Sequence, residues 1–211
     1  MSHVNPKGQP HPLGFWDERY AETAYAYGSE PNDFVREVAD RIPPGRALCL
    51  GEGQGRNAVF LAQRGHEVTA MDQSRTGLAR AEALAAERGV KIATIAADLA
   101  GFAIDPLAFS AIVSIFVHLP DALRRQVHAR VAGGLVAGGV FVFEQYGPEQ
   151  GRFRSGGPEG PERRPGLETL RAEFPGLELE IAREVTREVI EGVYHTGLAS
   201  TVQILARRPR A

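Results

Sequence analysis

Ala47-Leu48-Cys49-Leu50-Gly51-Glu52-Gly53-Gln54-Gly55-Arg56-Asn57 is the stretch that decides the fold. An apolar run enters a turn with glycine at every second position, and the helix-compatible segment Asn57-Ala58-Val59-Phe60-Leu61-Ala62 follows. This order predicts a buried strand, a tight loop and the start of a helix, where backbone N–H groups point toward a bound ligand. Glycine has no Cβ atom, so the loop backbone at Gly51, Gly53 and Gly55 can adopt positive φ and approach that ligand closely.

The next predicted strand, His66 to Met71, ends at Asp72. An acid at the tip of the second strand is placed to accept hydrogen bonds from the two hydroxyls of a ribose. The glycine loop and Asp72 together predict a nucleoside ligand.

Two residues in the loop indicate which nucleoside. A dinucleotide fingerprint, Gly-x-Gly-x-x-Gly, requires its third glycine at position 56, where this chain has Arg56. Glu52 would repel a pyrophosphate at short range, whereas it would attract a sulfonium and an α-amino group. The loop N–H groups could still hold a carboxylate. The pattern therefore favours a sulfonium nucleoside over a dinucleotide.

Length and composition limit the function classes. The chain has 211 residues and a formal net charge of −2, which suits one domain and gives no basic excess for nucleic acid. The single cysteine, Cys49, lies in an apolar strand and is interpreted as a core residue, so no disulfide is expected. No apolar run of about 18 residues and no leader are present, which predicts a cytoplasmic protein without a membrane span. The oligomeric state is not predicted.

Strand and helix patterns alternate along most of the chain. Residues 1–13 contain three prolines and are predicted to form a flexible arm, with 14–211 as a single domain. The aromatic stretch that begins at Phe15 either packs on the sheet edge or covers the ligand. Predicted strands cover about 47–50, 66–71, 90–97, 109–116 and 140–146, and predicted helices cover about 31–41, 74–88 and the segment after Pro120. This alternation predicts a parallel sheet with helices on both faces.

The composition changes after Tyr146. Half of residues 147–166 are Gly or Pro, and so long a segment without element signals predicts a lid or a substrate loop. A short helix near 167–173 follows, and then two strand-like stretches, about 177–190 and 193–207. Their short connection predicts an antiparallel hairpin.

Several motifs resemble one protein family over nearly the whole chain: Trp16-Asp17-Glu18-Arg19-Tyr20, Tyr27-Gly28, Pro31-Asn32, Gly51 to Asn57, Phe116-Val117-His118-Leu119-Pro120, Glu191-Gly192-Val193-Tyr194-His195 and Leu205-Ala206-Arg207-Arg208. The chain resembles the class I S-adenosylmethionine (SAM) methyltransferases, most of all the tellurite-resistance and thiopurine S-methyltransferase type. The resemblance implies an α/β, Rossmann-like, doubly wound and mostly parallel seven-stranded sheet of order 3-2-1-4-5-7-6 with a C-terminal antiparallel hairpin. It also implies SAM as cofactor, S-adenosylhomocysteine (SAH) as product and no metal.

The resemblance also implies which residues bind the cofactor. The methionine end would be held by Glu52 with the backbone of Gly51, Gly53 and Gly55, close to Asn57, and capped by Arg19 and Tyr27. The adenosine end and the sulfonium would be contacted by Asp72 at the ribose, Gln73 and Ser74 flanking the adenine, Asp98 and Leu99 at its edge, and Phe116 beside the sulfur.

Three residues are candidates for catalysis: His195, His118 and Glu144. His195 aligns with a hairpin histidine of the tellurite-resistance proteins, but Thr196 replaces the arginine that follows it there, which disfavours an oxyanion substrate. A thiol or chalcogen acceptor needs little help from a base, whereas an oxygen or nitrogen acceptor needs one nearby. Two of the three could instead be structural: His118 as a buried histidine, and Glu144 as a strand-edge acid whose oxygens are all hydrogen-bonded within the protein.

The predicted function is methyl transfer from SAM to a small-molecule acceptor, with a thiol or chalcogen species as the candidate, and without a nucleic-acid or membrane partner. Two alternatives stay open: a non-catalytic SAM-binding or interaction module, and an NAD-dependent oxidoreductase.

Overall fold

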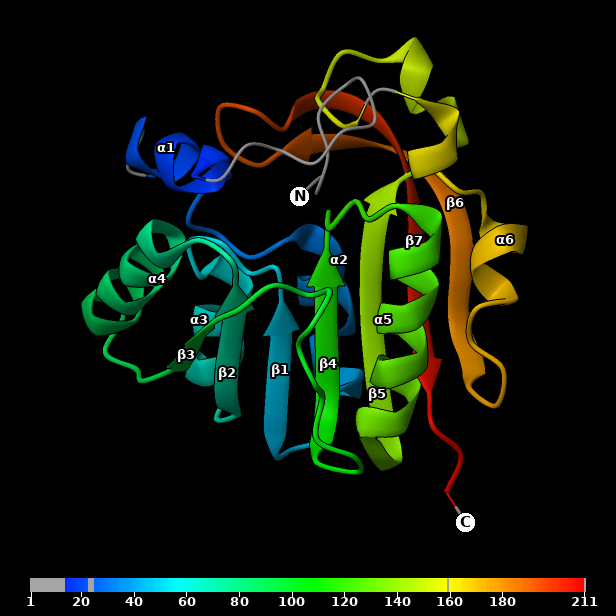
Figure 1. The fold of residues 1–211 in the computed structure, drawn as a ribbon, viewed down its shortest axis with the longest axis horizontal. Coiled ribbons are helices and arrows are strands. Elements are labelled where there is room, and N and C mark those ends of the chain that lie inside the picture. Colours follow the sequence, from blue (N-terminus) through cyan, green and yellow to red (C-terminus); the bar gives the residue numbers. More distant parts are fainter. Residues whose placement is uncertain (1–13, 23–24, 159, 211) are drawn as a thin grey trace.

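The computed structural model describes residues 14–22, 25–158 and 160–210. Its centre is a seven-stranded sheet of order β3-β2-β1-β4-β5-β7-β6 (Figure 1). Five strands are mutually parallel: β1 (Arg46–Leu50), β2 (Glu67–Asp72), β3 (Ala93–Ala96), β4 (Phe109–Ile115) and β5 (Leu135–Tyr146). The antiparallel hairpin β6 (Glu178–Ile190) and β7 (Thr196–Arg207) closes the sheet on β5. The predicted fold class and strand order are confirmed.

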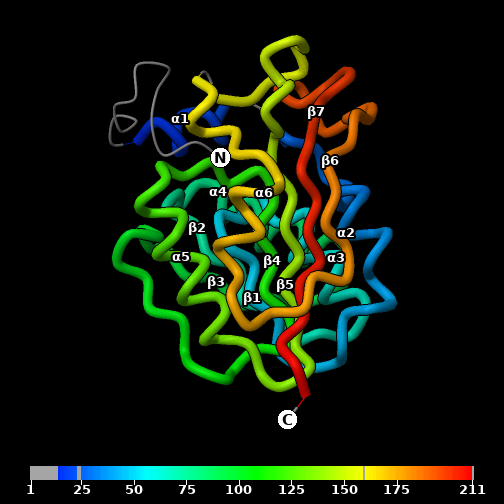
Figure 2. Tube along the Cα trace, turned by 90° about the vertical axis from the view of Figure 1, so that its right-hand side faces the viewer, coloured from blue at the N-terminus to red at the C-terminus, as the bar shows by residue number. Residues whose placement is uncertain are grey.

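Helices cover both faces of the sheet, with α5 (Asp121–Gly134) on one side and α2 (Asp33–Val38) and α3 (Arg56–Gln63) on the other (Figure 2). The inner strand β4 is buried along its whole length, as a continuous apolar run between two helical layers should be. Its alternate side chains separate accordingly: Val113 packs in the core beneath α2 and α3, and Ile112 packs in the core beneath α5. The remaining helices are α1 (Phe15–Glu22), α4 (Arg75–Glu87) and α6 (Leu167–Arg171).

Element boundaries differ from the sequence prediction in four places. The fifth strand begins at Leu135 rather than at Val140, because Leu135 already pairs with Phe109 of β4 ahead of a register shift. The third strand, β3 (Ala93–Ala96), is shorter than the predicted 90–97, because this edge strand pairs on one side alone and is largely exposed. The helix predicted over 31–41 divides into α2 and a 3₁₀ turn, Ala39–Arg41. The second hairpin strand starts at Thr196 rather than 193, because the Val193 N–H donates to the Ala26 carbonyl (3.1 Å) instead of pairing across the hairpin.

The segment 147–166 is folded against the hairpin. It contains two 3₁₀ turns, Pro148–Arg152 and Pro161–Arg163. The Gln150 side chain donates to Ser155 Oγ (3.0 Å) and accepts from the Ser200 N–H (2.9 Å), and Ser155 Oγ donates to the Leu198 carbonyl (2.9 Å). These bonds tie the segment to β7. The predicted arm, residues 1–13, lies outside the described residues. No helix in the described ranges is long and apolar enough to cross a membrane.

Candidate active site

The glycine loop after β1 needs its glycines. Gly51, Gly53 and Gly55 have φ of 58°, 63° and 91°, which L side chains rarely adopt. A Cβ atom at Gly55 would lie 2.5 Å from the Ala81 Cβ in α4, and one at Gly51 would lie 2.7 Å from Val117 Cγ2. The positive φ values are those that the sequence pattern predicts, and the loop in addition passes close to both neighbouring segments.

Glu52 holds the loop to α3. Its Oε1 accepts hydrogen bonds from the backbone N–H groups of Asn57 (2.8 Å) and Ala58 (2.9 Å), in the first turn of that helix. Burial raises the pKa of Glu52 to about 7, although these bonds oppose the shift. The predicted ligand-facing acid thus also fixes the loop geometry. The Asn57 side chain contacts the protein rather than the loop, since its Oδ1 accepts a hydrogen bond from the Asn32 N–H (2.9 Å).

Asp72, at the tip of β2, is buried and fixes the other side of the loop. Its Oδ2 accepts from the Gly53 N–H and its Oδ1 from the Ser74 N–H, both at 2.8 Å. Burial raises the pKa of Asp72 to about 6. Each oxygen has a further lone pair, so the carboxylate can still accept from ligand hydroxyls.

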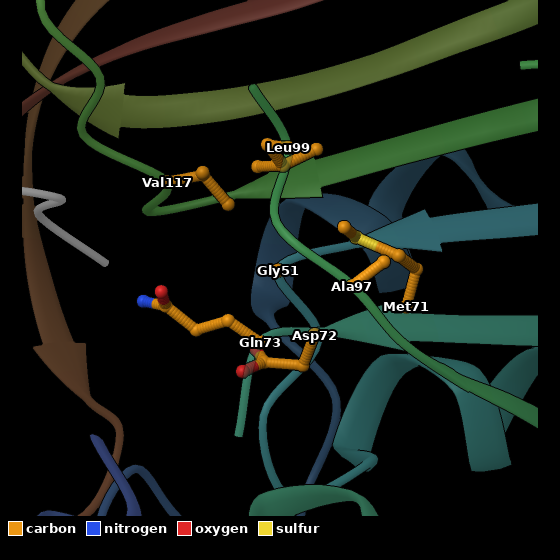
Figure 3. Close-up of a pocket in the computed structure, with 7 residues that line it drawn as sticks. All are labelled: Gly51, Met71, Asp72, Gln73, Ala97, Leu99 and Val117. Carbon is orange, nitrogen blue, oxygen red and sulfur yellow. The ribbon is translucent and has the colours of Figure 1, made fainter. Parts of the chain in front are cut away.

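A hollow that is open to solvent lies between the loop and the ends of β2, β3 and β4 (Figure 3). Leu99 and Val117 form one wall, and Asp72 and Gln73 lie opposite them. The lining is completed by Gly51, Met71 and Ala97. Apolar walls with a carboxylate at one edge are the chemistry that a nucleoside site needs. Among the predicted cofactor residues, the hollow brings together Gly51, Asp72, Gln73 and Leu99.

Two predicted adenine contacts, Asp98 and Ser74, do not line the hollow themselves, although each is next to a residue that does. Asp98 is exposed, and its Oδ1 accepts from the Ala100 N–H (2.8 Å), which makes it a turn residue. Ser74 is the N-cap of α4, where its Oγ accepts from the Gly77 N–H (3.0 Å) and donates to Asp17 (2.6 Å). The Ser74–Asp17 bond joins α1 to the helix that follows Asp72.

Aromatic side chains gather where β4, β5 and the hairpin tip meet. The Phe116 ring centroid lies 4.7 Å from that of Tyr146 and 4.8 Å from that of His195, and His195 lies 4.6 Å from Tyr27. The His118 ring is parallel to Tyr146 at 5.4 Å. Phe116 has a φ of 54°, an uncommon conformation for a bulky residue. We name these five residues the aromatic cluster.

Both histidines of the aromatic cluster are neutral near pH 7. Burial lowers the pKa of His195 to about 3 and places that of His118 well below its usual value. Three of their ring nitrogens have no hydrogen-bond partner among the described residues: both nitrogens of His118 and the Nδ1 of His195. Unpaired buried nitrogens of this kind are expected where a ligand binds.

Segment 147–166 lies over this cluster. Tyr146 donates its hydroxyl to the Ser155 carbonyl (2.8 Å). A Cβ atom at Gly157 would lie 2.7 Å from the Tyr146 ring, and one at Gly156 would lie 3.1 Å from the His195 ring. The two glycines therefore let this segment lie close against the cluster.

Glu144 does not have the free carboxylate that a general base needs. It is fully buried and accepts from Asn32 (2.6 Å), from Gln203 (2.8 Å) and twice from Arg187 (2.9 Å each). Four donors occupy its two oxygens, so the structural alternative replaces the catalytic interpretation.

Glu144 belongs to a buried polar network that the sequence did not predict. Asn32 caps α2 and donates to both Glu144 and Glu191 (2.8 Å), and Arg187 also reaches Glu191 (3.1 Å). Arg56 donates through Nη2 to Glu191 (2.6 Å). The network joins the hairpin tip to the helix that follows the glycine loop. Its only sequence signals are the Pro31-Asn32 and Glu191-Gly192 motifs, whose spacing carries no information about contact.

Arg19 and Tyr27, predicted at the amino-acid end of the cofactor, lie together. The Arg19 guanidinium carbon is 4.0 Å from the Tyr194 ring centroid and 5.2 Å from that of Phe15. Its hydrogen bond with Tyr27 opposes the rise that burial causes in the tyrosine pKa. α1 therefore contacts the hairpin tip as well as packing on α4. In the described part of the chain, no cluster of three or more His, Cys, Asp or Glu could hold a metal.

Residues 47–139 match the family model described as a methyltransferase domain. Two curated proteins are similar over part of the chain. Hemagglutinin 1 of Eikenella corrodens is 31% identical over 47% of this chain and 35% of its own length. The 2-heptyl-1-hydroxyquinolin-4(1H)-one methyltransferase of Mycobacteroides abscessus is 26% identical over 59% of this chain and 58% of its own length. The matches thus span less than two thirds of either relative.

Solved structures share the fold at low sequence identity. A protein from a study of the conversion of a disulfide bond into a thioacetal group in echinomycin biosynthesis has a TM-score of 0.74 at 18% identity, over 92% of this chain and 90% of its own. TehB from Haemophilus influenzae has a TM-score of 0.70 at 20% identity, over 92% and 66%. The chain therefore has a Rossmann-like methyltransferase fold. Together with the domain match and the curated methyltransferase, this supports an enzyme of the methyltransferase class.

Proposed function

We propose that the protein transfers the methyl group of SAM to a small-molecule acceptor bound at the aromatic cluster. The observation that carries the proposal is the hollow beside the glycine loop, where Asp72 faces Leu99 and Val117 across a slot suited to adenosine. The orphaned nitrogens of His118 and His195 mark a second polar site near Phe116. A cofactor site beside an acceptor site is the arrangement that methyl transfer needs.

Each part of the site has a role in this proposal. When bound, SAM supplies a methyl group on a positively charged sulfur. Asp72 accepts from the ribose hydroxyls, and the Gly53 backbone supports the methionine end. The Phe116 ring attracts a cation, and the other rings of the aromatic cluster exclude water from the reacting atoms. Segment 147–166 acts as the cover of the acceptor site.

The histidines favour an acceptor that ionises without help. A general base works best when its pKa lies near the working pH, and the pKa of His195 is about 3. Proton abstraction from an alcohol or an amine would therefore be slow. A thiol or a related chalcogen acceptor is already partly anionic at neutral pH, and His195 would orient it. The tellurite-resistance or thiopurine subgroup stays a prediction within this proposal.

A methyl-release assay tests the function. The full chain is incubated with SAM and a panel of thiols, chalcogen oxyanions and phenols, and SAH formation is measured. We expect turnover with a thiol-type acceptor. His195→Ala should leave SAH affinity unchanged and lower turnover at least about tenfold, because orientation of the nucleophile is lost. His66→Ala, at the opposite end of the sheet, is the matched control. SAM binding without turnover on any acceptor would instead support a non-catalytic module.

A further inference from the structure

Arg56 has an unfilled hydrogen-bonding edge. It is the first residue of α3, directly after Gly55, and its side chain is only 9% exposed. Nη2 donates to Glu191 Oε2 at 2.6 Å, whereas Nη1 is buried and has no partner among the described residues. A buried donor on a charged group is costly to leave unpaired. The guanidinium fork is also the geometry that recognises a carboxylate.

The surroundings of Arg56 match the methionine end of the cofactor. Its charge acts on the pKa values of Glu52 in the glycine loop, of Tyr27, and of His195 in the hairpin. The guanidinium is therefore near both the loop and the aromatic cluster, and its bond to Glu191 fixes it at the hairpin. Adenosine in the hollow would direct the rest of the cofactor from Asp72 toward this region.

Arg19 is a weaker candidate for the same contact. Its guanidinium already lies over the Tyr194 ring and bonds to Tyr27, and its side chain is half-buried. Arg56 is more deeply buried and has a free edge, so its interaction with an anion would be less screened by solvent.

We propose that Arg56, rather than Arg19, binds the α-carboxylate of the cofactor, an inference that rests on the proposed function. Glu191 would hold one edge of the guanidinium and the carboxylate the other. Because the Glu191 N–H donates to the His195 carbonyl (2.7 Å), this bridge would connect the cofactor to the residue that faces the acceptor. Arg56 is then a cofactor-binding residue that also positions the hairpin tip.

The test compares two ligands that differ in the amino-acid group. SAH carries the α-carboxylate, and 5′-methylthioadenosine lacks the whole amino-acid group. Both are titrated calorimetrically into the wild type, Arg56→Met and Arg19→Met, the variant of the competing candidate. We expect Arg56→Met to weaken SAH binding about tenfold to hundredfold. Methylthioadenosine binding should change less than about twofold, and Arg19→Met should change SAH binding less than about threefold.

Three results would overturn the inference: an Arg56→Met variant that binds SAH like the wild type, equal losses for both ligands, or the larger SAH-specific loss in Arg19→Met. If Arg56→Met does not fold, Arg56→Gln is used, since it keeps a donor for Glu191 and removes the charge. The deciding quantity is again the loss of SAH affinity relative to the loss of methylthioadenosine affinity. If the wild type binds neither ligand, the proposed function itself fails. Wild-type binding with an unchanged ratio refutes only the role of Arg56.

Discussion

Asp72→Asn removes the acid on which the nucleoside site depends. The carboxylate accepts from Gly53 and Ser74, one backbone N–H at each oxygen, and both bonds are 2.8 Å long. An asparagine amide can accept at only one of these positions, because its NH₂ group faces the other N–H. The side chain is almost completely buried, so water cannot replace the lost acceptor.

The expected magnitude follows from these contacts. Hydrogen bonds to a charged group contribute about 1.5–3 kcal/mol, so losing the carboxylate contacts to ribose should weaken SAH binding about tenfold to 150-fold. The orphaned N–H should lower the free energy of unfolding by about 1–3 kcal/mol. Calorimetry at pH 8 measures the affinity, because there the wild-type Asp72, with a pKa of about 6, is ionised. Urea denaturation at the same pH measures the stability.

Two matched amide variants serve as controls. Glu67→Gln changes an exposed acid at the other end of β2 and should leave affinity within about twofold. Asp98→Asn changes the exposed acid after β3, and SAH affinity should fall less than about threefold because an asparagine can keep the turn to Ala100. A folded Asp72→Asn variant with wild-type SAH affinity would refute the reasoning. A tenfold loss of SAH affinity in Asp98→Asn would support the adenine contact that the family resemblance implies.

Two further predictions concern the loop and its acids. Gly55→Ala should lower the free energy of unfolding by about 2–5 kcal/mol in urea denaturation, because the new side chain both requires positive φ and clashes with Ala81. Gly65→Ala has a similar φ (88°) but no atom near the added Cβ, so it should lower this free energy by only about 1–2 kcal/mol. Equal losses in the two variants would contradict the clash. Burial raises the pKa of Glu52 to about 7 and of Asp72 to about 6, and a cationic ligand that donates to them favours their ionised forms. SAM affinity should therefore rise from pH 5 to pH 8, with proton release at pH 6.5 detected by calorimetry in buffers of different ionisation enthalpy; affinity that falls over this range would contradict the assignment.

The sequence predicted the features that depend on neighbouring residues. The apolar run of β4 and the alternating glycines of the loop each specify a local conformation, so the topology and the position of the hollow beside Asp72 could be inferred. The role of Glu52 at α3 was not inferred, because its charge suggested a ligand contact rather than a cap five residues ahead. The local turn bond of Asp98 to the Ala100 N–H could have been inferred from the sequence, whereas its contact with adenine stays a prediction.

The buried network lies outside what one sequence can predict. Asn32 meets Glu144 and Glu191 across 112 and 159 residues, and Arg56 meets Glu191 across 135. No periodicity relates such positions, and a glutamate near the end of an apolar strand suggests a catalytic acid as readily as a buried ion pair. Only the packing of the hairpin on the segments near Asn32 and Arg56 separates the two.

The most direct measurement is a calorimetric titration of the full chain with SAH and, separately, with NAD. The account predicts that SAH binds at one site per chain, that NAD gives no binding heat, and that Asp72→Asn weakens only the SAH signal. Binding of NAD in competition with SAH, or no SAH binding to folded protein, would contradict the central claim that the glycine loop and Asp72 form an adenosyl sulfonium site.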